Sequence, residues 1–317
     1  INYGAKVIEQ SFQLHRCGLY LLSITMADYE FKYSESFDVT DDVKRAYDKN
    51  GFIILRGLMD NEEIAKLTKA LVEFGLVEKH SYGLPDQAGR EPRMMLWSHP
   101  GNDVTGMVPR CEKVVTTCEK LTGGDELYHY HTKIMMKDPK KGGSFEWHQD
   151  YGYWYKNGCL APDLISMFLA IDPCVKENGG LQVLVGSHKL GRIDHSFVEG
   201  QQGADKERVE WIKGRCEHMY INLQPGDALL FHCNLLHSSG PNDSEQRRWA
   251  FNCSFNKKNN DPVIDHHHPR YTKLHKVPNS AIKECNNFTD FTGKEFLDPA
   301  IDKTVKAGSK AWEEKKE

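Results

Sequence analysis

The spacing of apolar and polar positions predicts helices in the first third of the chain. Residues 41–50 follow Thr40, a favoured N-cap residue, and stop at Asn50-Gly51, so a helix with a glycine stop is expected there. The apolar run 52–57 predicts a short strand directly after it. These two elements begin the organised part of the chain.

A second helix and a loop are expected next. Asp60 and Glu63 have the spacing of a capping box, which predicts that a helix begins at about residue 61. Residues 79–110 are rich in glycine, proline and charge and are expected to form a loop that covers another part of the fold. A further helix is expected at 111–121.

From residue 126 the apolar period changes to that of strands. Several short strands punctuated by Gly and Pro turns predict a mainly β fold, a jelly roll or barrel flanked by the N-terminal helices. On 247–255, Trp249, Phe251, Cys253 and Phe255 share one face. The segments expected to hold strands are 126–137, 144–155, 163–173, 178–191, 218–242 and 247–255.

The composition narrows the class of protein without changing the predicted fold. The chain has 317 residues, 39% apolar and 27% charged, with a net charge of −4, which is typical of a globular protein. We find no basic stripe and no apolar run of about 18 residues, so neither a nucleic-acid partner nor a membrane span is expected. The nine cysteines include no C-x-x-C pair, which favours reduced thiols and a cytoplasmic protein.

The chain divides into three segments. Residues 1–36 are expected to be an N-terminal extension outside the core; its apolar patch could belong to a signal peptide, but a start at Met26 is preferred. Residues 37–256 are expected to form the functional domain. Residues 257–317 are expected to be a polar segment that packs on the core or trails from it. Its His266-His267-His268 run could bind a metal adventitiously, but a solvated run is preferred.

The candidate chemistry lies in the run FEWHQDYGYWY. On a strand His148 and Asp150 point to the same face, and together they are two thirds of a facial metal triad. Two histidines and one carboxylate suit non-haem iron(II), which keeps open positions for reactants. His237, at the end of an apolar strand, is the expected third ligand. His232 is the rival, but it lies on the opposite strand face.

Arg248 follows His237 by eleven residues, on the face of its strand opposite the bulky side chains. A buried guanidinium needs an anionic partner, and its planar fork suits a carboxylate. A dicarboxylate that chelates the metal at one end and meets Arg248 at the other satisfies both requirements.

These motifs resemble the phytanoyl-CoA dioxygenase family. The resemblance rests on H-x-D at His148 and Asp150, on H-x-S-G at His237, Ser239 and Gly240, and on Arg248. It extends over about 42–256 and includes NGFIILRG, ENGGLQVLVGSHK and QPGDALLFH. It implies a double-stranded β-helix (cupin-like) core, Fe(II), 2-oxoglutarate as co-substrate and O2.

The chain is most similar to the branch of ectoine and free-proline hydroxylases, and this implies roles for further residues. His131 and Met135 depart from the polar residues of that branch, and Asn252 stands where an aromatic is expected, which puts ectoine itself in doubt. Lys133 could instead be a solvated strand residue and Trp154 a core residue. The implied roles are iron ligation by His148, Asp150 and His237, co-substrate contacts by Arg248, Ser239, Lys133 and His131, and substrate contacts by Trp154, Phe231, Asn252 and Lys133.

The resulting hypothesis is an Fe(II)/2-oxoglutarate-dependent hydroxylase that releases succinate and CO2. Its expected substrate is a small polar metabolite such as a free or cyclic amino acid, and the expected state is a monomer or homodimer. Three alternatives stay open at this point: an acyl-CoA or other lipid-like substrate, a non-catalytic metabolite-binding jelly roll, and a zinc hydrolase with the same ligands.

Overall fold

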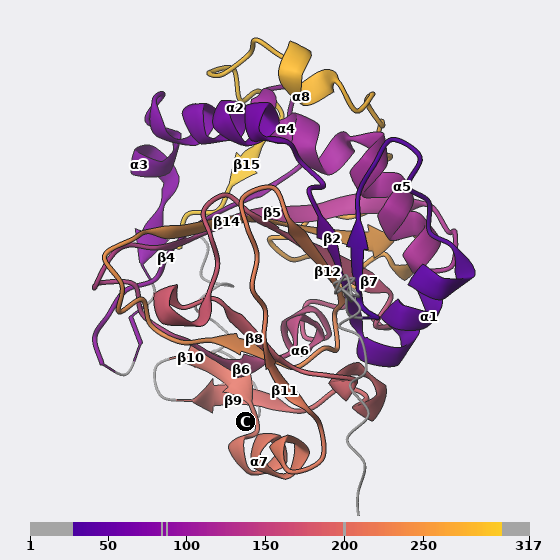
Figure 1. Cartoon of the computed structure of the whole chain (residues 1–317), viewed down its shortest axis with the longest axis vertical. Helices are drawn as coiled ribbons and strands as arrows, with labels where there is room; N and C mark the ends of the chain where they lie inside the picture. Colours follow the sequence, from indigo (N-terminus) through magenta and orange to yellow (C-terminus); the bar gives the residue numbers. More distant parts are fainter. Residues whose placement is uncertain (1–27, 84, 87, 199–200, 300–317) are drawn as a thin grey trace, which may run out of the picture.

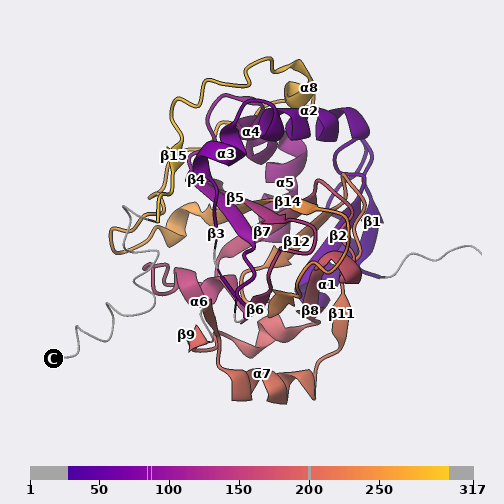
Figure 2. The ribbon, with the colours of Figure 1, turned by 90° about the vertical axis from the view of Figure 1, so that its left-hand side faces the viewer.

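Two sheets packed against each other form the centre of the computed structural model, which describes residues 28–83, 85–86, 88–198 and 201–299 (Figures 1 and 2). The larger, nine-stranded sheet has the order β1-β2-β12-β7-β14-β5-β4-β15, with β3 also paired to β4. Its strands are β1 (Glu30–Lys32), β2 (Phe52–Arg56), β3 (Tyr82–Gly83), β4 (Arg93–Ser98), β5 (Leu127–Lys137), β7 (Leu164–Ala170), β12 (Ala228–His232), β14 (Arg248–Lys257) and β15 (Glu295–Phe296).

The smaller sheet has four strands in the order β11-β8-β13-β6. Because strands from the middle of the chain alternate between the two sheets, the expected jelly-roll arrangement is confirmed. A separate hairpin pairs β9 with β10. The bounds are β6 (Phe145–His148), β8 (Leu181–Leu184), β9 (His195–Val198), β10 (Gln201–Ala204), β11 (His218–Tyr220) and β13 (His237–Ser239).

Helices α2, α4 and α8 cover the outer face of the large sheet at the top of Figures 1 and 2, whereas α7 lies at the opposite end beyond the small sheet. The capping box of α2 is present, and α1 ends at Gly51 with a φ of 83°, as the sequence predicted. The helices are α1 (Asp41–Asn50), α2 (Asn61–Val72), α3 (Leu76–His80), α4 (Val104–Met107), α5 (Glu112–Leu121), α6 (Asp150–Trp154), α7 (Lys206–Lys213) and α8 (Ala281–Glu284).

Strand β7 shows why the sheet separates two cores. All seven of its residues are buried. Ile165, Met167 and Leu169 pack on the helix side, whereas Phe168 and Ala170 face the small sheet. A strand buried on both faces reads as a continuous apolar run, and alternation then assigns each side chain to one core.

The expectation of a loop over 79–110 is wrong. Residues 93–98 form β4, which pairs with β5 between Arg93 and Trp97, and α4 follows. Glycines, prolines and charges flank this strand on both sides, and they dominated the composition of the window. The apolar run RMMLWS carries the strand signal, and Met95 and Trp97 are fully buried.

The chain ends also differ in part from expectation. Residues 30–32, expected to lie outside the core, form β1 in parallel pairing with β2, because Phe31 and Tyr33 pack against the large core. The start at Met26 lies outside the described residues. Part of the polar C-terminal segment packs on the core, since β15 pairs with β4 and Ile282 is 1% exposed. No helix in the described ranges has the length and apolar character of a membrane span.

Candidate metal centre

His148, Asp150 and His237 converge inside the fold although 87 residues separate the last two. Strands β6 and β13 are neighbours, and His148 is directly opposite His237 in their register. One ligand atom of each of the three residues lies within 4.8 Å of the others. The two imidazole centroids are 4.1 Å apart. This set therefore has the donor types and the proximity of a facial iron site.

Asp150 reaches this place by a route that the sequence did not predict. The strand ends at His148, and Asp150 begins the short helix α6 instead of continuing the strand. Gln149 holds the turn between them. Its fully buried side chain donates to the carbonyls of Gly191 and Asn234 and accepts from the backbone amide of Ile193. The backbone amide of Gln149 donates to His195 Nε2.

The two histidines are oriented as metal ligands require. Nδ1 of His148 lies 2.7 Å from the carbonyl oxygen of Glu146, and Nδ1 of His237 lies 2.9 Å from that of Leu235. A nitrogen facing a carbonyl must carry the hydrogen, which leaves Nε2 with the lone pair. Burial lowers the pKa of both imidazoles, so both are neutral near pH 7.

Asp150 is buried and held by two hydroxyls in series. Ser166 Oγ, on β7, donates to Asp150 Oδ2 at 3.0 Å and lies 2.9 Å from Ser254 Oγ, on β14. Lys133 Nζ, on β5, is 3.9 Å from the other carboxylate oxygen. A carboxylate oxygen beside two imidazoles completes a donor set that suits non-haem iron(II).

His232, the rival third ligand, does not face this site. Its Nδ1 accepts from the Asn234 amide at 3.0 Å, and its ring is 5.3 Å from that of His188. His188 in turn approaches the Asp48 carbonyl, near the end of α1. Both histidines therefore contact other parts of the chain and not the triad. His232 ends β12 in the large sheet and His237 begins β13 in the small sheet, so the expected alternation along one strand is not what separates them.

Arg248 and Lys137 form a pair of buried cations near the triad. They are direct cross-strand partners in the register of β14 and β5, and they are 1% and 0% exposed. Arg248 Nη2 donates to the Gly179 carbonyl, and its Nε has no hydrogen-bond partner among the residues that the structure describes. Lys137 Nζ donates to Ser239 Oγ at 2.7 Å and to backbone carbonyls. Within the described ranges no carboxylate pairs with either.

The sequence reasoning did not identify Lys137. A signal was available, because Lys133, Met135 and Lys137 share one face of a strand and the first two were already placed inside. Burial lowers the pKa of Lys137 well below its usual value, and the Arg248 charge adds to this effect. Two like charges opposite each other on adjacent strands repel, so the space around the Arg248 and Lys137 side chains needs an anion.

The other predicted site residues fall into two groups. Lys133, Phe231, Ser239 and Asn252 line the same pocket as the triad and Arg248. His131 and Trp154 do not belong to that lining. They are buried with ring centroids 5.7 Å apart, and Trp154 packs in an aromatic cluster with Tyr130.

Comparison with known proteins agrees with this geometry. The sequence profile of the family described as phytanoyl-CoA dioxygenase (PhyH) matches residues 47–250. The chain belongs to this family. The dioxygenase class and its requirements for Fe(II), 2-oxoglutarate and O2, expected from the sequence, are thereby confirmed.

Relatives within and near the family act on small molecules. L-proline trans-4-hydroxylase of Streptomyces griseoviridis is 26% identical over 238 residues, which cover 70% of this chain and 88% of the relative. Ectoine dioxygenase of Sphingopyxis alaskensis is 27% identical over 213 residues, covering 62% and 69%. The crystal structure of EctD from S. alaskensis with 2-oxoglutarate and 5-hydroxyectoine shares the fold, with a TM-score of 0.65, 21% identity and coverage of 78% and 90%.

Proposed function

We propose that this PhyH-family dioxygenase hydroxylates a C–H bond of a small polar metabolite, with a free or cyclic amino acid first among the candidates. His148, Asp150 and His237 would hold the iron, since they combine two neutral imidazoles with a buried carboxylate. The bound metal supplies the oxidising chemistry with O2 and 2-oxoglutarate. The chain positions the reactants and keeps water out.

The observation that carries this proposal is the uncompensated pair Arg248 and Lys137. Both are buried, they face each other across two strands, and Arg248 lines the pocket of the triad. A carboxylate between them would relieve their repulsion and would give the unpartnered Arg248 Nε an acceptor. Ser239, which accepts from Lys137, would keep that ammonium in place. The distal carboxylate of 2-oxoglutarate fits this position between Arg248 and Lys137.

The side chains proposed to contact the substrate favour a compact polar molecule. Phe231 packs its ring 5.0 Å from that of His237, while Lys133 and Asn252 offer a cation and an amide in the same pocket. Asn252 Oδ1 is buried without a hydrogen-bond partner from any described residue. A zwitterion with a carboxylate and an ammonium would satisfy both polar groups. The free volume beside the triad is only about 40 Å³, so co-substrate and substrate must displace side chains to enter.

The names of two relatives, L-proline trans-4-hydroxylase and ectoine dioxygenase, agree with a substrate of this size. We further propose that residues 37–256 form the catalytic domain, which contains the family match. We also propose that the enzyme works in the cytoplasm as a monomer or homodimer, without nucleic acid. The eight cysteines in the described part of the chain are all free thiols, which agrees with a reducing compartment.

The decisive experiment is a metabolite screen by mass spectrometry. We expect a product one oxygen heavier, formed only with Fe(II) and 2-oxoglutarate, and one succinate for each product. His148→Ala, Asp150→Ala and His237→Ala should each abolish turnover, whereas His218→Gln, in the exposed β11, should not. If acyl-CoA substrates react and amino acids do not, the substrate class is wrong. If no substrate releases succinate, a binding module is the better description.

A further inference from the structure

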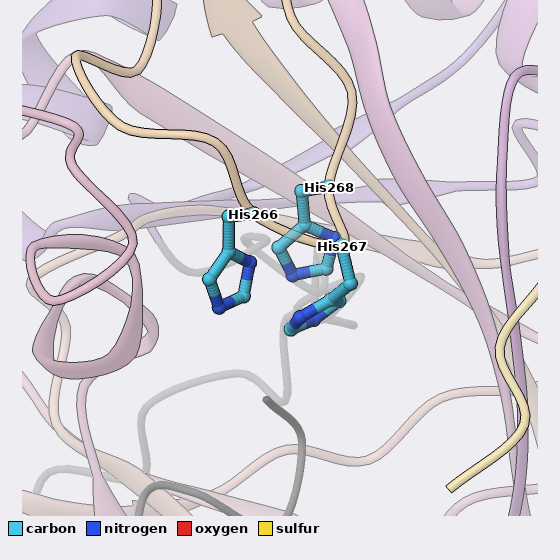
Figure 3. Close-up of side chains that lie close together, drawn as sticks. All are labelled: His266, His267 and His268. Atoms are coloured by element: carbon cyan, nitrogen blue, oxygen red, sulfur yellow. The ribbon is translucent and has the colours of Figure 1, made fainter. Parts of the chain in front are cut away.

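Three consecutive histidines gather at a second place in the fold (Figure 3). His266, His267 and His268 lie in the irregular segment after β14, and one ring nitrogen of each is within 4.8 Å of the others. The ring centroids are 3.8 Å apart for the first two and 4.1 Å apart for the last two. The run was expected to be solvated, but His268 is only 7% exposed and the other two are half-buried.

The cluster lines a cleft that the large sheet builds. Leu96 and Ser98 at the end of β4 form one wall, and β15 with the residues after it forms another. Ser98 Oγ approaches the His267 carbonyl at 3.4 Å, so the sheet edge contacts the histidine segment directly. The cleft has a volume of about 520 Å³, which leaves room for an ion with solvent or a small ligand.

His268 shows the clearest sign of a missing partner. Its ring stacks on that of His131 at 4.6 Å with an interplanar angle of 21°, and Tyr130 packs 4.5 Å away. These contacts fix the ring, yet its buried Nδ1 has no hydrogen-bond partner in the described part of the chain. A buried polar atom left unsatisfied is unfavourable and needs an explanation.

We propose that His266, His267 and His268 form a second metal site, distinct from the triad, which binds Zn²⁺ or a similar late first-row divalent ion. Three imidazoles with one position open to the cleft match the donor set of open zinc sites. Zinc–nitrogen bonds of about 2.0–2.1 Å require the nitrogens to close to roughly 3.3 Å, a small movement for half-buried side chains. An all-nitrogen set also differs in metal preference from the oxygen-containing triad.

Such an ion would fasten the 265–270 segment against the sheet. It would also stabilise the ring stack of His268 on His131, which the proposed hydroxylase chemistry does not use. The inference is independent of that chemistry, because the cluster and the triad share no residue.

The test isolates the second site by removing the first. In the full chain with His148→Ala and His237→Ala, stripped by chelator, we expect calorimetric titration with ZnCl2 to give one Zn²⁺ per chain and the thermal midpoint to rise. Adding His267→Gln and His268→Gln should abolish both effects. His275→Gln, an exposed histidine of the same C-terminal segment, is the matched control and should keep them.

Two results would overturn the proposal. One is that the chain lacking the triad binds no Zn²⁺, and the other is that the His267→Gln, His268→Gln chain still binds it. Because His268 is buried, thermal unfolding without metal must first show that this chain is folded. The single variant His267→Gln on the same background provides a second measurement, in which the visible absorption of bound Co²⁺ should weaken or vanish.

Discussion

Two buried lysines, Lys294 and Lys137, have opposite surroundings. Lys294 Nζ lies 2.6 Å from Asp103 Oδ1, both side chains are 0% exposed, and the ammonium sits 4.5 Å from the Trp97 ring centroid. Lys137 is equally buried, but its neighbours are a hydroxyl, backbone carbonyls and the Arg248 charge. Lys294 has a carboxylate partner, whereas Lys137 has none within the described ranges.

This difference separates a structural charge from a binding charge. The Lys294 pair joins the C-terminal segment to α4, and removing Asp103 leaves the buried ammonium without the carboxylate that pairs with it. At Lys137 the protein keeps two cations together, which is unfavourable by itself and becomes favourable when a carboxylate arrives. Substitutions at the first place should therefore affect stability, and substitutions at the second should affect binding.

The largest effect on stability is expected from Asp103→Asn. It removes the anion and leaves the Lys294 ammonium buried, so the free energy of unfolding should fall by about 3–5 kcal/mol. Denaturant titration measures this loss. The apparent Michaelis constant for 2-oxoglutarate should stay unchanged at temperatures where the variant is folded. A variant as stable as the parent would show that the pair is dispensable.

The largest effect on binding is expected from Arg248→Ala. It leaves the distal carboxylate without its two-pronged partner, a loss of about 2–5 kcal/mol, so the Michaelis constant for 2-oxoglutarate should rise by at least roughly thirtyfold. The free energy of unfolding, measured without co-substrate, should fall by less than this loss of binding free energy, because the substitution also removes the repulsion between Arg248 and Lys137. An unchanged Michaelis constant would assign the carboxylate to another cation.

A smaller effect on binding is expected from Lys137→Met, which keeps the length of the side chain without its charge. A hydrogen bond to a charged group contributes about 1.5–3 kcal/mol, so affinity for 2-oxoglutarate should fall by roughly 10- to 100-fold. Lys137→Arg serves as the control that retains the charge. If Lys137→Met lowers stability but leaves affinity intact, Lys137 is a structural residue like Lys294.

The smallest effect, when measured over a single pH unit, is the pH dependence of the free energy of unfolding at Lys294. Burial lowers the pKa of Lys294 from 10.5 to about 8, although Asp103 opposes this. Between these values the unfolded chain binds a proton that the folded chain has released, so the free energy of unfolding should rise with pH. We expect a gain of about 1 kcal/mol per pH unit relative to Lys294→Met. Equal slopes between pH 8 and 10.5 in both proteins would contradict this assignment.

The sequence by itself determined the features that depend on neighbouring residues. The capping box at Asp60 and the glycine stop of α1 are local, and both were predicted. Strand alternation is local too, so it placed Arg248 and Asn252 on the inner face. It could not decide on His232, because His232 ends β12 in the large sheet and His237 begins β13 in the small sheet. The motif around His148 and His237 indicated the family, because its spacing and residue types can be recognised in the sequence without knowledge of the fold.

Only the tertiary structure decided which distant segments meet. The register that sets Lys137 opposite Arg248, the helical start at Asp150, the strand at 93–98 and the burial of His268 all depend on such pairings. Lys137 and Ser239, for example, are 102 residues apart along the chain. Alternation tells which face a side chain takes, but not what lies across from it, because register is set by packing over the whole sheet.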